Sequence, residues 1–286
     1  MTSNPQPPAR ALQEHGLSDA VFIERTAIAS IWKVMRQTGE AAALKVYHGP
    51  TMGNEGAGFA YLEALNGQGA AGVYACTSSI ALTEWLAGPS LGDLSRGGQD
   101  DLATRELLGV ALKLHRQGVT PQTDLPTLDR WFRGLLTLRI PPGCPPAARQ
   151  NLEDCRALAS RLLADPQDVC PLHGDLHHDN IRLGDRGYCA FDAKGIIGER
   201  AYELANAFRN PKGAAALIRN PDRIRALRDH WSAPFNVASH RLMQWAAVKC
   251  ALSIAWNSDL SKIPEDEFDL LDLLLAIAKE GEATPI

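Results

Sequence analysis

The chain has 286 residues, enough for one large domain or two compact lobes. Its 29 basic and 33 acidic side chains give a formal net charge of −4, and 45% of its residues are hydrophobic. This composition excludes a disordered chain and provides no basic surface for a phosphate backbone, so no nucleic-acid partner is expected.

The first third of the chain predicts a small antiparallel sheet with one helix. Short apolar runs rich in β-branched and aromatic residues predict the strands, and two of them flank the turn sequence Gln-Thr-Gly-Glu as a hairpin. A helix is expected over residues 54–65, where Phe59, Leu62 and Leu65 share a face. The strands are expected at residues 20–23, 28–35, 41–47, 73–76 and 79–84.

The pattern changes at residues 85–90, and helices dominate downstream. Apolar residues recur at helical spacing, and Gly118 follows the first helix as a candidate C-cap. Six prolines between residues 119 and 146 predict a connection with only short helical pieces. The helices are expected at residues 101–117, 147–163, 222–231, 239–256 and 265–279.

One short β segment interrupts these helices and collects polar residues. The runs 181–183 and 188–191 flank Gly-Asp-Arg-Gly, which predicts a hairpin. Asp175 and Asn180 precede it in the sequence His-Gly-Asp-Leu-His-His-Asp-Asn, and Asp192 follows it directly. Because a hairpin returns its ends to one place, Asn180 and Asp192 are expected to lie close together.

These three side chains fit the chemistry of phosphoryl transfer. The amide oxygen of Asn180 and the carboxylate of Asp192 are hard ligands that suit Mg²⁺. Asp175 is placed to accept a proton from a hydroxyl group. Phosphoryl transfer requires mainly that metal-bound phosphates and the acceptor oxygen be held in line. The spacing Asp-x₄-Asn, then a hairpin, then Asp resembles the catalytic loop of the kinase superfamily.

Two stretches carry a closer resemblance. Residues 173–181 resemble the H-G-D-x-x-x-x-N-I loop of the aminoglycoside phosphotransferases. Residues 191–206, FDAKGIIGERAYELAN, are similar to the D-P-K-G-x-x-G-D-x-x-Y-D-L-A pattern of the streptomycin 6-kinase and hydroxyurea phosphotransferase group, and Leu114-His115 also fits. The resemblance covers most of the chain, and its specific motifs lie in residues 173–206.

The resemblance implies an α+β, bilobal protein-kinase-like fold. An antiparallel-sheet N-lobe for nucleotide binding would span residues 1–86, with a hinge at about 83–89, and a mainly helical C-lobe would span residues 87–286. The implied activity is ATP- and Mg²⁺-dependent transfer of the γ-phosphate to an alcohol group of a small molecule. In that scheme Asp175 is the catalytic base, and the metal ligands are Asn180 and Asp192.

The resemblance also implies roles for residues of the N-lobe. Lys45, in the third strand, would contact the α- and β-phosphates. Glu55, at the start of the next helix, would hold that lysine, and Glu63 is the alternative partner. Backbone groups of Glu84 and Leu86 would meet the adenine.

The chain differs from the family pattern in one segment and at Ala193, Glu199 and Glu203, and the two glutamates replace aspartates and keep the charge. Residues 26–30, which would cover the nucleotide, contain no glycine, and Ser30 or its backbone is expected to meet a phosphate. Ala193 replaces a proline, whereas Lys194 matches and could neutralise phosphate charge beside the metal. Glu203 replaces an aspartate, and we expect it to be a structural partner of the catalytic loop.

Other functions remain open at this point. The glycine-poor loop also fits a non-catalytic nucleotide-binding module with a kinase-like fold. His173, His177 and His178 could instead belong to a zinc hydrolase site. If the protein is a kinase, its acceptor could be a streptomycin-like aminocyclitol, an amino sugar, hydroxyurea or an ordinary metabolite.

The expected location is the cytoplasm. The six cysteines form no C-x-x-C pair, and the polar first ten residues show no signal-peptide core. The longest apolar run, residues 270–278, is interrupted by Asp272 and is too short to cross a bilayer. We therefore expect a small-molecule alcohol substrate and no membrane partner, while the sequence does not specify the oligomeric state.

Overall fold

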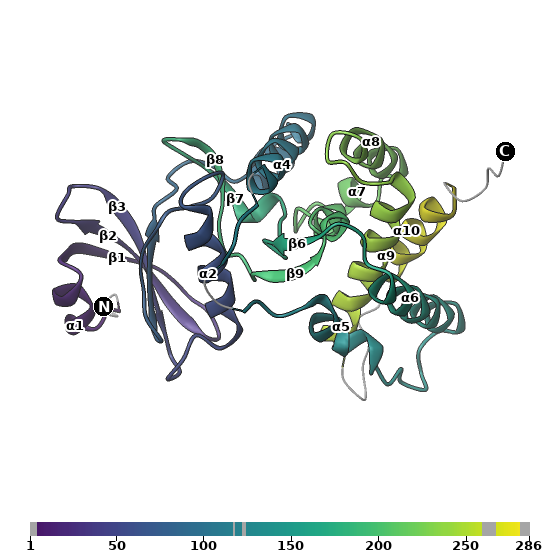
Figure 1. Ribbon diagram of the computed structural model, residues 1–286, viewed down its shortest axis with the longest axis horizontal. Coiled ribbons are helices and arrows are strands. Elements are labelled where there is room, and N and C mark those ends of the chain that lie inside the picture. The colour runs from purple at the N-terminus through teal and green to yellow at the C-terminus, as the bar shows by residue number, and fades with distance from the viewer. Residues whose placement is uncertain (1–4, 117, 122–123, 259–266, 281–286) are drawn as a thin grey trace.

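The protein has two lobes in this computed structural model, which describes residues 5–116, 118–121, 124–258 and 267–280. One lobe is a β-sheet with two helices, and the other is mainly helical (Figure 1). Small β elements lie where the two lobes meet. The α+β class and the bilobal arrangement expected from the sequence are confirmed.

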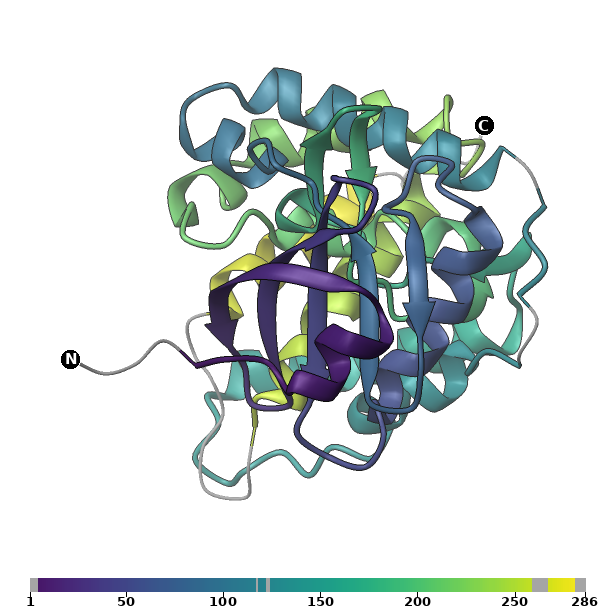
Figure 2. The same ribbon diagram turned by 90° about the vertical axis from the view of Figure 1, so that its left-hand side faces the viewer.

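The N-lobe sheet is antiparallel, with the strand order β1-β2-β3-β5-β4. The sequence predicted all five strands and α2, but not the short α1. In Figure 2, seen from the N-lobe side, the dark purple helix α1 lies in front of the sheet. The elements are α1 (Ala9–Glu14), β1 (Leu17–Arg25), β2 (Ala29–Arg36), β3 (Ala41–Tyr47), α2 (Gly56–Leu65), β4 (Val73–Cys76) and β5 (Ile80–Glu84).

Alternation along β3 gives the sheet two different faces. Leu44 points to an apolar cluster with Trp32, on the side where α1 lies. Lys45 and Tyr47 point to the other face, where Tyr47 packs near Phe59 of α2. Because successive side chains of a strand alternate between faces, Lys45 is directed toward α2 and the space between the lobes.

The C-lobe is built around α9, which is buried on almost every side. Trp245 of α9 packs edge-to-face with Phe132 and Tyr202, at ring centroid distances of 5.7 and 5.5 Å. A helix that is apolar all round is typical of a core position. The helices are α3 (Leu91–Arg96), α4 (Asp100–His115), α5 (Leu128–Leu136), α6 (Pro146–Ala164), α7 (Ala215–Ile218), α8 (Pro221–Ser232), α9 (Ser239–Trp256) and α10 (Phe268–Glu280).

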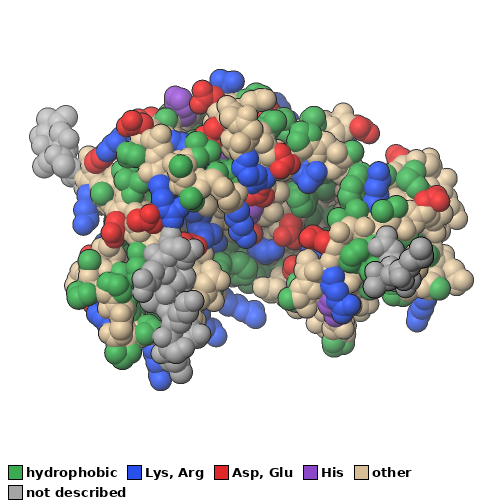
Figure 3. Space-filling model, turned by 180° about the vertical axis from the view of Figure 1, so that it is seen from behind, with side chains coloured by type: hydrophobic (Ala, Val, Ile, Leu, Met, Phe, Trp, Pro, Cys, Tyr) green, Lys and Arg blue, Asp and Glu red, His purple; other side chains and the backbone are tan. Residues whose placement is uncertain are grey.

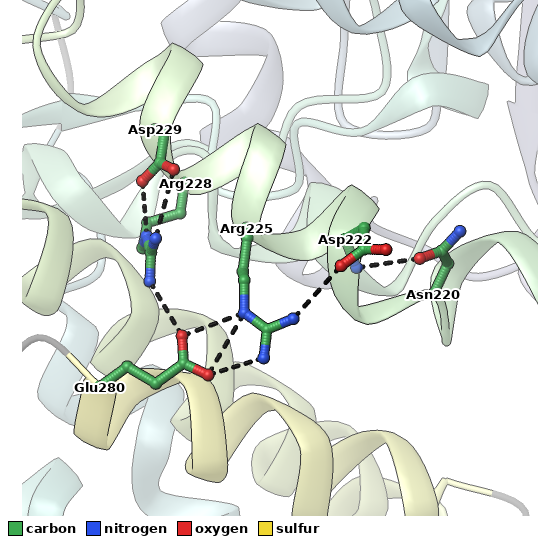
Figure 4. A network of polar contacts seen from close by, with 6 residues as sticks. All are labelled: Asn220, Asp222, Arg225, Arg228, Asp229 and Glu280. Atoms are coloured by element: carbon green, nitrogen blue, oxygen red, sulfur yellow. Dashed lines mark hydrogen bonds and ion pairs between the residues drawn. The ribbon is translucent and has the colours of Figure 1, made fainter.

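Polar contacts on the outer side of this lobe join α8 to α10. Asn220 caps α8 by accepting from the backbone N–H of Asp222, and Glu280 accepts from Arg225 and Arg228 (Figure 4). Exposed ion pairs of this kind contribute little to stability, because water screens them. The buried apolar face of α10 therefore supplies most of its attachment.

Two pairs of short strands lie between the lobes. The hairpin of β7 (Ile181–Gly184) and β8 (Gly187–Ala190) was predicted. The pairing of β6 (Val169–Leu172) with β9 (Ile196–Glu199) was not, because each strand has only four residues and the partner is distant in sequence. Three 3₁₀ segments complete the region: η2 (His178–Asn180), η3 (Arg200–Tyr202) and η4 (Ala205–Arg209).

The β7–β8 hairpin also touches the N-lobe. Arg186, in its turn, pairs with Glu84 at the end of β5. The N–H of Gly88 donates to the carbonyl of Leu183 at 2.7 Å, and the N–H of Leu183 donates to the carbonyl of Pro89 at 3.1 Å. These contacts tie the connection between the lobes to the hairpin.

The cysteines, the helix ends and the apolar character of the helices were also predicted from the sequence. The six cysteines are reduced and form no disulfide, as their spacing indicated. Gln117, Glu265 and Asp266, predicted at helix ends, lie outside the described residues. In the part of the chain that the structure describes, no helix combines the length and apolar character needed to span a membrane.

Candidate active site

One buried carboxylate, that of Glu203, hydrogen-bonds to the backbone of the catalytic loop, residues 173–180. Glu203, 1% exposed, accepts the backbone N–H of His173 at 2.9 Å and of Gly174 at 3.0 Å. His115 at the end of α4 donates to the same carboxylate at 2.8 Å. Burial favours the neutral acid, but the hydrogen bond and charge of His115 outweigh it and lower the pKa of Glu203. The predicted structural role of Glu203 is confirmed.

Asp175 has one carboxylate oxygen fixed and one open. Asn206 of η4 donates its amide N–H to Oδ1 at 2.7 Å. No other side chain in the described residues donates to Oδ2. Burial opposes ionisation, but positive charge, above all that of Lys249, lowers the pKa of Asp175. Asp175 is therefore a carboxylate with an oxygen that can accept a proton.

Asn180 and Asp192 meet where the hairpin closes, as predicted. The N–H of Phe191 donates to the carbonyl of Asn180 at 3.0 Å. The side-chain N–H of Asn180 donates to the carbonyl of Asp175 at 3.0 Å, so its amide oxygen points away from the loop backbone. Asp192 adopts a left-handed φ of 56°, which is uncommon outside glycine and is often found at functional sites.

The two oxygen donors fit a divalent cation. The amide oxygen of Asn180 accepts no hydrogen bond from any described residue, and the side chain of Asp192 is 37% exposed. Hard oxygen ligands that leave room for water and phosphate oxygens are the typical environment of Mg²⁺. Burial alone would raise the pKa of Asp192, but the positive charges of Lys194 and Lys45 outweigh burial and lower this pKa below its usual value. The carboxylate of Asp192 is therefore ionised.

Lys45 reaches this site from the N-lobe. Its ammonium lies 2.5 Å from Oε2 of Glu55 and 3.5 Å from Oδ1 of Asp192. Tyr47 donates to the same Oε2 of Glu55 at 2.5 Å. Glu55 is thus the partner of Lys45, whereas Glu63 is exposed on α2. Figure 3 shows the hollow between the lobes, with acidic and basic side chains along its edges.

The connection between the lobes has an open backbone donor at Leu86. Leu86 follows β5, and its N–H donates to no acceptor among the described residues, which suits the predicted adenine contact. The N–H of Glu84 already donates to the carbonyl of Gly72 at 2.8 Å, and its side chain accepts from the N–H of Gly72 at 3.0 Å. A contact of Glu84 with adenine would therefore use its carbonyl.

Ser30 is the one predicted site residue whose side chain the structure does not bring to this site. In the β2–β3 register Ser30 is opposite Val46, while Ile31 is opposite Lys45. Directly opposite residues share a face, so the Ser30 hydroxyl lies on the other side of the sheet from Lys45. It bonds to His48 at 3.0 Å instead. The Ser30 hydroxyl is therefore directed away from the Lys45 site, and a phosphate contact of the Ser30 backbone stays a prediction.

The profile of the aminoglycoside/hydroxyurea antibiotic resistance kinases matches residues 15–261 of the chain. The chain belongs to this kinase family. A streptomycin 3''-kinase from Klebsiella pneumoniae is 37% identical over 227 residues, which cover 78% of this chain and 82% of that protein. The protein is therefore a phosphotransferase that acts on a hydroxyl group.

Solved structures confirm the protein-kinase-like fold. The choline kinase LicA from Streptococcus pneumoniae matches with a TM-score of 0.60 at 13% identity, over 96% of each chain. An amicoumacin kinase solved with AMP-PNP and Ca²⁺ matches with a TM-score of 0.59 at 13% identity, over 98% of this chain and 95% of that one.

The three histidines of the kinase's catalytic loop have structural contacts. The ring of His173 donates to the carbonyl of Phe191 at 3.0 Å, and the ring of His177 accepts the backbone N–H of Asp179 at 3.2 Å. Nε2 of His178 lies 3.4 Å from Nη2 of Arg223. Burial lowers the pKa of His177 to about 4 and that of His178 to about 3. These side chains stabilise the loop as neutral groups.

Sequence reasoning missed two residues beside Asp175. Asn206, which fixes Oδ1, stands at the end of the recognised motif and was not given a role. Lys249 is 2% exposed in the middle of α9, and burial lowers its pKa to about 8. The sequence signal that could have identified Lys249 is a single lysine within an apolar helix. Buried lysines are rare unless an opposite charge lies nearby.

Removing Lys249 should change the pH dependence of the kinase. Its positive charge holds the pKa of Asp175 down against burial, so Lys249→Met should raise that pKa. The acid limb of log(kcat/KM) against pH should then move to higher pH. Lys279→Met, an exposed lysine of α10, is the control and should leave the limb in place. An unmoved limb in Lys249→Met would contradict this role.

Two glycines allow α2 to approach the loop that follows Asp192. A Cβ on Gly58 would lie 1.8 Å from the carbonyl oxygen of Ala193. A Cβ on Gly195 would lie 2.1 Å from the carbonyl oxygen of Ala57. This backbone contact couples α2, which begins next to Glu55, to the position of Asp192.

Gly58→Ala should therefore reduce activity by separating Lys45 from Asp192. A displacement of about 1 Å at a catalytic site can cost about 10²-fold in rate, and we expect a loss of that order in kcat/KM for ATP. Gly56→Ala on the same helix is the matched control, because a Cβ there meets nothing within 4 Å. Steady-state kinetics on both variants test the contact, and equal activities would disprove it.

Proposed function

We propose that this kinase transfers the γ-phosphate of ATP, with Mg²⁺, to a hydroxyl group of a streptomycin-like aminoglycoside. The single observation that carries the proposal is the convergence of Asp175, Asn180, Asp192 and Lys45 on one site. The Klebsiella pneumoniae relative, named for streptomycin, supports the acceptor class. The fold neighbour with AMP-PNP and Ca²⁺ supports a nucleotide with a divalent cation.

The residues divide the work between phosphates and acceptor. Lys45, held by Glu55, binds the α- and β-phosphates, and the backbone at Leu86 binds the adenine. Asn180 and Asp192 hold Mg²⁺, which when bound would neutralise charge on the phosphates. Asp175 accepts the proton of the acceptor hydroxyl as its oxygen bonds to the γ-phosphorus.

Electrostatics keep these groups in the required protonation states. Asp175 and Asp192 are both ionised at neutral pH because nearby lysines lower their pKa values despite burial. An ionised Asp175 can act as a base, and an ionised Asp192 can bind a cation. The neutral histidines of the loop add no charge that would compete with these roles.

The test is a product analysis by mass spectrometry. The protein is incubated with ATP and Mg²⁺ and, separately, with streptomycin, hydroxyurea, choline and an amino sugar. We expect streptomycin to gain one phosphoryl group, and EDTA to abolish the gain. Phosphorus NMR then locates the hydroxyl, since the sequence pattern includes 6-kinases and the relative is a 3''-kinase. Modification of another compound, with streptomycin unchanged, would overturn the proposed acceptor.

A further inference from the structure

The two oxygens of Asp192 are each held by a different lysine. Lys45 lies 3.5 Å from Oδ1, and Lys194 lies 3.2 Å from Oδ2. Lys45 has a second counter-ion in Glu55, at 2.5 Å. Lys194 has no second carboxylate within ion-pair distance among the described residues. Within the part of the chain that the structure describes, its ion-pair partner is therefore the carboxylate proposed to bind the metal.

Metal binding to Asp192 would leave one of these lysines with a counter-ion and the other without one. When Asp192 turns its oxygens to a cation, Lys45 keeps Glu55 but Lys194 loses its close partner. The side chain of Lys194 is only 18% exposed, and a poorly solvated ammonium without a partner is costly. An anion that enters together with the metal, such as a nucleotide phosphate, would satisfy it.

The backbone places Lys194 next to the catalytic loop. Its N–H donates to the carbonyl of His173 at 2.8 Å, which joins it to the catalytic loop. A Cβ on Gly174, the neighbour of Asp175, would lie 3.6 Å from the Cβ of Lys194. The charge of Lys194 acts on both Asp175 and Asp192. Lys194 thus stands near both the base and the metal ligand.

We propose that Lys194 contacts the γ-phosphate and stabilises its charge during transfer, while Lys45 serves the α- and β-phosphates. This assignment rests on the proposed function. The acceptor oxygen bonds to the γ-phosphorus as the bond from that phosphorus to the bridging oxygen breaks. The proton of the hydroxyl goes to Asp175, and the electron pair leaves on the β-phosphate of ADP. Lys194 exchanges no proton in this step and acts as a positively charged donor to the γ-phosphate oxygens.

Kinetics on Lys194 variants test the assignment. Lys194→Met should lower kcat by about 10²–10³-fold, the typical cost of losing one donor to transition-state charge, with little change in KM for ATP or acceptor. Lys194→Arg should restore part of the rate, because it keeps a positive donor. Lys279→Met is the matched control and should behave as wild type. Unchanged kcat in Lys194→Met, or a rise in KM for ATP alone, would overturn the assignment.

A binding measurement separates a phosphate contact from a structural role and needs no acceptor. Calorimetry with Mg²⁺ compares ADP alone with ADP plus aluminium fluoride, which mimics the transferring group. In Lys194→Met the fluoride complex should bind far more weakly while ADP binds as in wild type. Equal loss for both ligands would mean that Lys194 is structural. If wild type binds the fluoride complex but does not modify streptomycin, the acceptor proposal fails and this assignment stands.

Discussion

Replacing Asp175 by asparagine should lower kcat for phosphorylation of the acceptor by about 10²–10⁴-fold, the typical contribution of a positioned base. The asparagine oxygen can still accept the amide N–H that Asn206 now gives to Oδ1, so the local hydrogen bonding is kept. What is lost is the open oxygen that takes the proton. The measurement is kcat at saturating ATP and acceptor, with circular dichroism to verify the fold.

Asp185→Asn provides the matched control for this variant. Asp185 is exposed in the turn between β7 and β8, so the same change of charge is made close to the site without touching it. Its kcat should equal that of wild type. Full turnover by Asp175→Asn would show that another group takes the proton, and the mechanism proposed here would be wrong.

Asp192→Asn should lower the rate of the kinase and weaken its response to Mg²⁺. Metal ions stabilise transferring phosphoryl groups by several kcal/mol, and about 1.4 kcal/mol corresponds to tenfold in rate, so kcat should fall by about 10²-fold or more. The Mg²⁺ concentration at half-maximal rate should also rise, because an amide is a weaker ligand than a carboxylate. Initial rates across a Mg²⁺ titration at fixed ATP measure both effects.

The backbone at this position should tolerate the substitution. Asn and Asp are the non-glycine residues that most readily adopt the left-handed conformation of Asp192. Asp19→Asn is the matched control, since Asp19 is exposed and also has a left-handed φ, of 50°. A Mg²⁺ titration of Asp192→Asn that superimposes on that of wild type would rule out this ligand.

Local sequence patterns were sufficient to predict much of the fold and the residues at the centre of the candidate site. The Gly-Asp-Arg-Gly turn indicated the hairpin, and hairpin geometry then brought Asn180 to Asp192. The family resemblance implied Lys45 in the third strand and Glu55 at the start of the next helix, and the structure pairs these two side chains. Each of these steps depends on neighbours within about twenty residues of one another.

The missed features all depend on contacts between distant segments. Asn206 and Lys249 reach Asp175 only because η4 and α9 pack beneath the catalytic loop. The close approach of Gly58 to Ala193 joins segments more than a hundred residues apart. The face on which the Ser30 side chain lies depends on the register of β2 on β3, which no local pattern fixes.

The most direct measurement is a crystal structure of the protein with AMP-PNP and Mn²⁺, in which anomalous scattering locates the metal. The metal should lie between the amide oxygen of Asn180 and the carboxylate of Asp192, with Lys45 on the α- and β-phosphates. The γ-phosphate should then face Asp175. Metal density away from Asn180 and Asp192, or a γ-phosphate directed away from Asp175, would contradict the account.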